Sequence, residues 1–267
     1  MPARPDPAAL LALASDIARE AGALILGALP GERQVEAKSS ATDLVSEMDR
    51  ASETLIVQQI LQARPHDGVL GEEGAERAGS SGVRWVIDPI DGTTNYLHRI
   101  PHFAVSIGIE LEGVTVAGVV FNPAADELFA AALGHGATLN GAPIHPSTET
   151  RLGSALIGTG FGYDAGLREQ QAAIVVQRVL PQVADVRRSG SAALDLCWVA
   201  CGRLDAYYER GVQPWDVSAA SLVVREAGGV SDTLEGTPMT ASTTWIASNA
   251  ALSSAFRALI EDATRLP

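Results

Sequence analysis

The sequence predicts an α/β protein, with more strands in its middle and more regular alternation toward its C-terminus. From about residue 150 onward, apolar runs of strand length alternate with segments of helical periodicity, which is the layout of α/β folds. Before that point, two long helical patterns precede a group of strands and turns. We expect two parts, 1–148 and 149–267, which meet near the turn-forming residues Pro146-Ser147-Thr148.

The two N-terminal helices are predicted from apolar residues that recur at helical spacing. Over 7–29, Leu10, Ala14 and Ile17 share one face, and the Pro-Gly pair at 30–31 ends the pattern. A short extended piece at 35–39 follows. The second helix is expected to begin near Thr42-Asp43 and to run to about residue 64, where Pro65 closes it.

The strands are predicted from short apolar runs that turn residues separate. In the first part we expect strands at 68–70, at 85–88 with a stop at Pro89, at 103–111 and at 114–121, and a hairpin turn at Asn140-Gly141. In the second part we expect strands at 155–159, 183–187, 204–209 and 244–247, alternating with helices at 165–180, 190–202, 215–227 and 250–264.

The charge balance excludes several classes of partner. Lys and Arg number 19 against 32 Asp and Glu, for a net charge of −13. A protein that binds a nucleic-acid backbone or an anionic membrane needs the opposite sign, so neither partner is expected. A content of 46% hydrophobic and 19% charged residues argues against disorder. An acidic protein can still act on an anion if metal cations lie between them.

The ends of the chain and its cysteines indicate a cytoplasmic protein. Asp16, Arg19 and Glu20 interrupt the first apolar run, so it matches neither a signal peptide nor a membrane span. Cys197 and Cys201 are four residues apart in a helical pattern. That spacing favours neither a disulfide nor a complete zinc site, and we expect core thiols.

The segment Trp85-Val86-Ile87-Asp88-Pro89-Ile90-Asp91-Gly92-Thr93-Thr94-Asn95 is the most informative in the chain. In a continuous strand Asp88 and Asp91 would face opposite sides, but Pro89 ends the ladder and Gly92 permits a tight turn. Both carboxylates can then converge at the carboxyl end of the strand, beside a helix start that suits phosphate. The alternative is that Asp91 is a turn residue and Asp88 a cap.

Other carboxylates strengthen the first interpretation. Glu72 lies between glycines after an apolar run, Asp216 follows Pro-Trp at a helix start, and Asp49 lies in the second helix. Each alone is more often a solvated charge or, for Asp216, an N-terminal cap. Two bare carboxylates ~4 Å apart repel by ~4 kcal/mol at an effective dielectric of ~20, so a cluster requires cations. Oxygen-only ligands favour hard cations: Mg²⁺ first, then Mn²⁺ or Ca²⁺.

At this point the sequence resembles the inositol monophosphatase family of metal-dependent, lithium-sensitive phosphatases. The segments that carry the resemblance follow in family order and cover nearly the whole chain: Lys38 to Val45, Gly71-Glu72-Glu73, Asp88 to Asn95, Gly190 to Asp195, and Pro214-Trp215-Asp216 with Glu226-Ala227-Gly228-Gly229. The stretches Gly158 to Phe161 and Arg187 to Ser191 resemble the bacterial branch.

The resemblance implies a layered αβαβα sandwich of the inositol monophosphatase and fructose-1,6-bisphosphatase type, and a homodimer. It also implies roles. Glu72, Asp88 and the Ile90 carbonyl would hold one Mg²⁺; Asp88, Asp91 and Asp216 a second; and Glu72 would touch a third. Thr93 with Asp49 would activate the attacking water, and the amides of Gly92 and Thr93 would bind phosphate. Asp91, Glu209, Ser191 and Ala192 would face the substrate, and Lys38 has a less defined role. Mn²⁺ would substitute for Mg²⁺, whereas Li⁺ and Ca²⁺ would inhibit.

The activity that the resemblance implies is hydrolysis of inositol 1-phosphate by direct attack of a metal-activated water. No Ser, Cys or His constellation suggests a covalent intermediate. Glu209 can accept hydrogen bonds from vicinal hydroxyls, although it could also be a surface carboxylate. Histidinol phosphate, fructose 1,6-bisphosphate or a 3′-phosphonucleotide are alternative substrates of the same chemistry. A protein-binding regulator that keeps the phosphatase fold is an alternative of another class.

Overall fold

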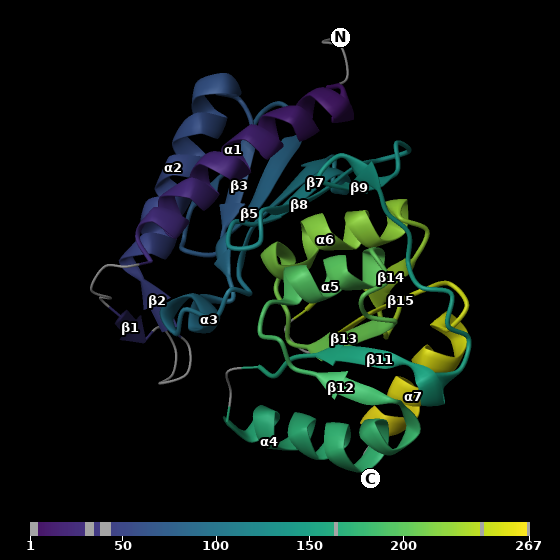
Figure 1. Ribbon diagram of the computed structural model, residues 1–267. Helices are drawn as coiled ribbons and strands as arrows, with labels where there is room; N and C mark the ends of the chain where they lie inside the picture. The colour runs from purple at the N-terminus through teal and green to yellow at the C-terminus, as the bar shows by residue number, and fades with distance from the viewer. Residues whose placement is uncertain (1–4, 30–34, 38–43, 163–164, 241–242, 266–267) are drawn as a thin grey trace.

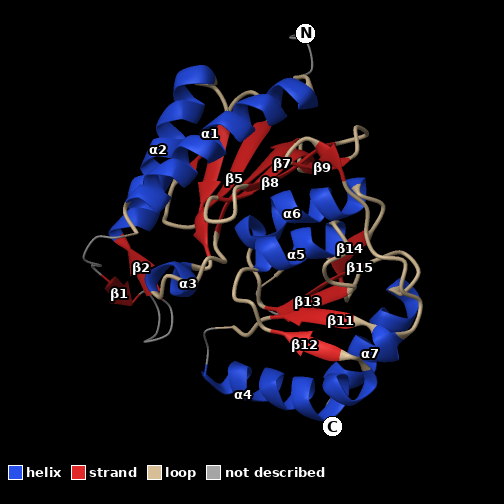
Figure 2. Ribbon diagram, viewed as in Figure 1, coloured by secondary structure: helices blue, strands red, loops and turns tan. Residues whose placement is uncertain are grey.

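The computed structural model shows five layers of alternating helices and sheets (Figures 1 and 2). It describes residues 5–29, 35–37, 44–162, 165–240 and 243–265. Helices α1 (Pro7–Gly27) and α2 (Glu47–Ala63) form one outer layer against an eight-stranded sheet. Helices α5 (Ala192–Ala200) and α6 (Pro214–Glu226) form the middle layer. A five-stranded sheet and the outer helices complete the sandwich, so the αβαβα architecture is confirmed.

The eight-stranded sheet has the order β10-β9-β8-β7-β6-β5-β3-β4, and it is antiparallel except where β3 pairs with β5. Its strands are β3 (Gly68–Gly71), β4 (Glu76–Arg77), β5 (Val83–Asp91), β6 (Ala104–Leu111), β7 (Val114–Asn122), β8 (Glu127–Ala132), β9 (Ala137–Leu139) and β10 (Ala142–Pro143). The parallel pair matters for the site because the carboxyl ends of β3 and β5 lie side by side.

The outer helices bury the apolar stripe that the sequence predicts. Leu10, Ala14 and Ile17 of α1 are buried in one core cluster. The same cluster contains Ile56 and Ile60 of α2 and apolar side chains of the eight-stranded sheet. Asp6 caps α1 by accepting the backbone N–H of Ala8. A short two-stranded ribbon of β1 (Val35–Ala37) and β2 (Leu44–Ser46) precedes α2.

The five-stranded sheet has the order β12-β11-β13-β15-β14. Its strands are β11 (Leu156–Thr159), β12 (Asp185–Arg187), β13 (Ala206–Arg210), β14 (Val230–Thr233) and β15 (Thr244–Ser248). Helices α4 (Ala165–Ile174) and α7 (Ser253–Thr264) cover its outer face (Figure 1). Helix α4 continues as a π-helical turn at Val175–Val179 and a 3₁₀ turn at Leu180–Gln182.

The middle helices hold the two sheets together. Buried residues of α5 and α6, including Leu196 and Leu222, share a core cluster with Phe129 of the first sheet and Tyr207 of the second. The first sheet lies entirely within 1–148 and the second within 149–267. The boundary near residue 148 stays a prediction, because α5 and α6 belong to the second part and also pack on the first sheet.

Three details differ from the sequence-based expectation. The second helix begins at Glu47 and not near residue 42, since residues 44–46 pair as a strand. Strand β5 runs through Pro89 to Asp91 and is not stopped by the proline. Strands β4, β8 and β14 were not expected, because β4 and β14 are largely polar and β8 carries no clear alternation. No helix among the described residues is long and apolar enough to cross a membrane.

Candidate active site

The end of β5 brings Asp88 and Asp91 to the same side of the sheet. Asp88 is opposite Ser106 and Asp91 is opposite Ala104, so β5 has one more residue than β6 between these two pairs. This extra residue is a β-bulge, which offsets the alternation that would otherwise place the two carboxylates on opposite faces. The Ile90 backbone N–H donates to Oδ1 of Asp88 across 3.0 Å. The predicted convergence therefore occurs through a bulge rather than through the end of the strand.

Gly92 turns the chain from β5 into the short helix α3 (Thr93–Leu97). Its φ of 93° lies in the left-handed region that favours glycine. A Cβ at this position would lie 3.1 Å from the carbonyl oxygens of Gly190 and His102. The tight turn places the first amides of the helix at the cleft, where they have no acceptor within the helix.

Asp49 lies behind this turn and binds Thr93. The Asp49 carboxylate is fully buried on α2, and Oγ1 of Thr93 lies 2.9 Å from its Oδ1 and 3.1 Å from the Ile90 carbonyl oxygen. One hydroxyl has one proton, so it donates to one of these two acceptors at a time. The Thr93 hydroxyl is thus held between a buried carboxylate and the end of the strand, as the predicted pairing requires.

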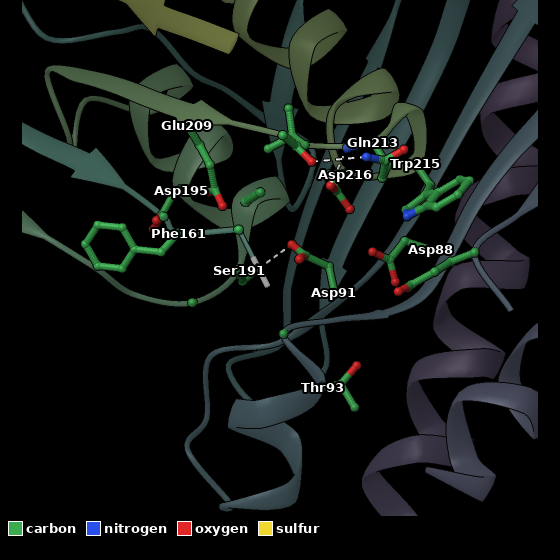
Figure 3. A pocket seen from close by; sticks show the side chains of 18 of the residues that line it. Asp88, Asp91, Thr93, Phe161, Ser191, Asp195, Glu209, Gln213, Trp215 and Asp216 are labelled. Atoms are coloured by element: carbon green, nitrogen blue, oxygen red, sulfur yellow. Dashed lines mark hydrogen bonds between the residues drawn. The ribbon is translucent and has the colours of Figure 1, made fainter. Parts of the chain in front are cut away.

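Asp91 joins the two parts of the chain. Its Oδ2 accepts a hydrogen bond from Oγ of Ser191 across 2.5 Å (Figure 3). The same oxygen accepts the backbone N–H of Ala193 across 2.7 Å. Ser191 is the N-cap of α5 and also accepts from the Leu194 N–H. Asp91 therefore lies at the positive end of a helix that begins a hundred residues further along the chain.

Asp216 and Glu72 complete the acidic wall of the cleft. Gln213, and not Asp216, is the N-cap of α6; Asp216 is the third residue of the helix, and its carboxylate accepts the Gln213 backbone N–H across 2.7 Å. Glu72 follows β3, and its backbone N–H donates to the Ile87 carbonyl of the neighbouring parallel strand. Asp216 therefore supports the start of α6 from its first turn and also lines the cleft.

The cleft has a volume of about 280 Å³ and an unbalanced charge. Among the described residues that line it, Arg188 is the one cation and six side chains are carboxylic acids: Glu72, Asp88, Asp91, Asp195, Glu209 and Asp216. Such an excess of carboxylates at close range is unfavourable without counter-charge.

The pKa values of the aspartates express this imbalance. Burial, with the nearby charges of Glu72, Asp91 and Asp216, raises the pKa of Asp88 well above its ordinary value. Burial and the charge of Asp91 do the same to the pKa of Asp216. Burial raises the pKa of Asp91 to about 6, against the opposing hydrogen bonds from Ser191 and Ala193. A divalent cation would favour the ionised form of all three carboxylates.

The donor set fits a hard cation. Every candidate ligand in this wall is a carboxylate or carbonyl oxygen, which suits hard divalent cations. As the side chains stand, no three His, Cys, Asp or Glu residues of the described part of the chain are placed to hold one ion together. Binding would therefore require the carboxylates to turn toward a shared centre.

Glu209 stands at the opposite end of the cleft from Asp88 (Figure 3). The Tyr207 hydroxyl lies 2.6 Å from its Oε2. Burial raises the pKa of Glu209 to about 7, although the Tyr207 hydrogen bond and the charge of Arg188 lower it. A Cβ on Gly160 would meet this carboxylate at 1.9 Å, so glycine is required beside it. Glu209 is not an exposed surface carboxylate.

The structure gathers the predicted residues of the site that it describes, and their chemical roles stay predictions. Asp49 lies against Thr93. The other ten predicted residues line the cleft: Glu72, Asp88, Ile90, Asp91, Gly92, Thr93, Ser191, Ala192, Glu209 and Asp216. The segment 38–43, which contains Lys38, lies outside the described residues. Cys197 is buried and Cys201 half-buried, and both are free thiols, as expected.

Sequence reasoning assigned no role to several other residues of the cleft. The Arg188 guanidinium carbon lies 5.9 Å from the centre of the Phe161 ring, and both residues line the end of the cleft near Glu209. Asp195, Gln213 and Trp215 also line it. Phe161 and Arg188 lie inside the two segments that resemble the bacterial branch of the family, and that resemblance is the feature of the sequence that points to them. Their contact with the cleft depends on loops that only the fold brings together.

Fold and site together define an α/β enzyme whose cleft collects carboxylates suited to hard cations. The sequence profile of the inositol monophosphatase family matches residues 6–265. The chain belongs to the inositol monophosphatase family and is a phosphoric monoester hydrolase.

Individual relatives agree with this assignment. The chain is 48% identical over 246 residues to the inositol-1-monophosphatase SuhB of Mycobacterium tuberculosis, with 84% of each chain covered. It is 42% identical over 223 residues to the Nus factor SuhB of Escherichia coli, with 83% of this chain and 84% of the relative covered. The crystal structure of the extragenic suppressor protein suhB from Bartonella henselae superposes with a TM-score of 0.89 at 38% identity, covering 95% of this chain and 98% of that one.

Proposed function

We propose that the protein hydrolyses inositol 1-phosphate, or a closely similar polyol phosphate, with Mg²⁺ as its cofactor. The observation that carries the proposal is the cleft itself, in which six carboxylic acids and one guanidinium surround the turn at Gly92. A phosphate monoester dianion would not enter such a cleft without cations, and the acidic wall provides oxygen ligands for them. The names of the M. tuberculosis and other relatives support inositol phosphate as the substrate.

Each residue has a role in this proposal. Glu72, Asp88 and the Ile90 carbonyl hold one ion, Asp88, Asp91 and Asp216 hold a second, and Glu72 contacts a third. When bound, these ions supply positive charge to the phosphoryl oxygens and lower the pKa of a coordinated water.

The remaining steps belong to side chains of the chain itself. The amides of Gly92 and Thr93 donate to the phosphate at the start of α3. The Thr93 hydroxyl, held by Asp49 and the Ile90 carbonyl, orients the attacking water and passes its proton toward Asp49.

The other end of the cleft would receive the polyol. Glu209 in its ionised form accepts hydrogen bonds from vicinal hydroxyls, and Asp91, Ser191 and Ala192 border the ring on the side of the phosphate. Tyr207 limits the rotation of Glu209 by its hydrogen bond, so the acceptor oxygens are pre-positioned. A cleft of about 280 Å³ accommodates a six-membered polyol ring with one phosphate.

A side-by-side turnover assay tests the substrate. Inositol 1-phosphate, histidinol phosphate, fructose 1,6-bisphosphate and a 3′-phosphonucleotide are compared at equal Mg²⁺ by release of inorganic phosphate. We expect the highest kcat/KM for inositol 1-phosphate, and Glu209→Gln to lower it more than it lowers turnover of a substrate without vicinal hydroxyls. A preference for histidinol phosphate would reject the inositol proposal.

The same proposal includes the properties that accompany this activity in the family. Mn²⁺ replaces Mg²⁺, Li⁺ and Ca²⁺ inhibit, and two copies of the chain form a homodimer. Metal titrations of the assay and the mass of the particle in solution check these points separately. The name of the E. coli relative favours a second role in regulation. Absence of Mg²⁺-dependent phosphate release from all four substrates would make a protein-binding role the better proposal.

A further inference from the structure

Glu53 is a buried carboxylate outside the cleft, and it binds the loop that carries Glu72. It is 6% exposed and lies on α2. Its Oε2 accepts the backbone N–H of Glu73 across 2.9 Å, and its Oε1 accepts the N–H of Ala75 across 3.0 Å. Both carboxylate oxygens are therefore used to hold one short segment of main chain.

This contact completes the restraint of Glu72. On one side, the Glu72 N–H donates to the Ile87 carbonyl across 3.1 Å, and on the other side the next amide, of Glu73, donates to Glu53. The loop is also closed by the Gly71 N–H, which donates to the Ala75 carbonyl across 2.7 Å. The backbone before and after Glu72 is thus fixed by two different elements, β5 and α2.

Gly71 makes room for the Glu53 carboxylate. A Cβ on Gly71 would lie 2.1 Å from Oε2 and 2.8 Å from Cδ of Glu53. Gly71 does not need a left-handed conformation, so the close approach of the carboxylate is the reason for a glycine here. The glycine and the buried acid form one packing unit.

Helix α2 holds a second part of the site in the same way. Asp49 lies four residues before Glu53, on the same face of the helix. Asp49 binds the Thr93 hydroxyl at the start of α3, whereas Glu53 binds the loop after β3. Burying two carboxylates on one helix is costly, which a purely structural helix could avoid with apolar residues.

We propose that Glu53 is a positioning residue that sets the metal affinity of the site by fixing the backbone on which Glu72 is carried. This inference rests on the proposed function, in which Glu72 is a metal ligand. Residues that orient metal ligands commonly change metal affinity by ~10–100-fold when they are altered. Glu53 contacts neither substrate nor reacting atoms, so its effect is on metal binding and not on the chemical step at saturating metal.

The test compares two Glu→Gln variants in the purified full-length protein. Glu53→Gln keeps the size of the side chain but has one acceptor oxygen, so one of the two amides faces an NH₂ group. Glu76→Gln is the matched control. Glu76 is exposed on β4, and its substitution removes the same charge near the same loop. Mn²⁺ binding is measured without substrate, from the paramagnetic resonance signal of the free ion.

We expect the Mn²⁺ dissociation constant of the Glu53→Gln variant to rise about tenfold, and that of the Glu76→Gln variant to stay at the wild-type value. In assays, the Mg²⁺ concentration for half-maximal activity should rise by the same factor, while kcat at saturating Mg²⁺ stays close to that of the wild type. Equal Mn²⁺ affinities for wild type and Glu53→Gln would overturn the inference alone. A wild type that binds no Mn²⁺ would overturn the proposed function as well.

A double-mutant cycle of Glu53 and Gly71 distinguishes the loss of their contact from a general loss of folding. In the wild type, Gly71→Ala must displace the Glu53 carboxylate, so it should weaken Mn²⁺ binding as Glu53→Gln does. In a Glu53→Ala background the carboxylate is absent and the Ala75 Cβ, 3.1 Å away, is the remaining close neighbour, so Gly71→Ala should cause a smaller loss than it causes in the wild type. Losses that add in full would show that the two residues do not act through one contact.

Discussion

Asp67 and Asp88 are two buried aspartates beside the same pair of parallel strands. Their surroundings shift the two pKa values in opposite directions. Asp67 immediately precedes β3 and is 1% exposed, and Asp88 lies near the carboxyl end of β5 and is 2% exposed. Burial raises the pKa of Asp67, but hydrogen bonds from Arg64, Ser81 and Trp85 outweigh it, so the pKa falls below its ordinary value. The pKa of Asp88 instead rises, first through burial and then through the neighbouring carboxylates.

The difference lies in what the chain supplies to each carboxylate. Asp67 accepts from the Arg64 guanidinium, from the Ser81 hydroxyl across 2.6 Å and from the Trp85 indole across 2.9 Å. Asp88 accepts the Ile90 amide and faces other acids. A buried acid that the chain neutralises is structural, whereas one that it leaves in acidic surroundings is suited to an external cation.

The largest effect on activity is expected for an acid that the chain does not neutralise. Asp91→Asn removes a charge from the acidic wall while its amide oxygen can still accept from Ser191 or Ala193. A metal ion stabilises the transition state by several kcal/mol, so we expect Mg²⁺-dependent phosphate release to fall by about a thousandfold. The Mg²⁺-induced rise in melting temperature should shrink as well. Wild-type turnover by this variant would show that the assignment of Asp91 to a metal is wrong.

Glu209, at the other end of the cleft, is a third acid whose pKa is shifted by burial. Its pKa of about 7 in the folded protein lies above its ordinary value of 4.5, mainly because of burial. The neutral form is therefore favoured by folding, and its contribution to stability is lost as the pH rises through about 7. We expect Glu209→Gln, in chelator, to exceed the wild type by up to about 3 kcal/mol in unfolding free energy at pH 8, with little difference below pH 4.5.

Urea unfolding at several pH values measures this effect, and Glu76→Gln is again the exposed control. A Glu209→Gln variant with the same stability difference at all pH values would contradict the raised pKa.

The smallest effect is expected for the neutralised acid. Asp67→Asn loses the charge that pairs with Arg64 but can still accept from Ser81 or Trp85, so the unfolding free energy should fall by about 2 kcal/mol. Because the pKa of Asp67 is lowered, its stabilisation is present above about pH 4 and is lost as the pH falls further. Thermal unfolding at pH 7 and pH 3 should show a gap between variant and wild type that narrows in acid. Per folded molecule, kcat should be unchanged; a loss of turnover comparable with that of Asp91→Asn would remove the distinction between the two acids.

Much of the site was predictable from local sequence. Asp88, Asp91 and Gly92 lie within five residues, and the strand and turn that present them follow from their own residue types. The place of Asp216 in the first turn of a helix was predictable for the same reason, although the N-cap itself is Gln213. The continuation of β5 through Pro89 was not, because the bulge depends on pairing with β6.

Glu53 was not singled out from the sequence, although it lies four residues from Asp49. A glutamate in a helix is ordinarily a solvated charge, and nothing in its neighbours shows that Gly71 will leave space for it. The same holds for Asp67, whose partners Ser81 and Trp85 come from beyond the next strand.

By itself, the sequence determined the alternation of helices and strands, the excess of acid and the short motifs, because these depend on residue type and on spacing along the chain. The tertiary structure alone decided which acids are neutralised. Asp91 meets Ser191 across a hundred residues, and Arg188 meets Phe161 at the cleft. Whether a buried carboxylate is stable, titratable or ready for a cation depends on donors within a few ångströms, and those donors come from distant segments.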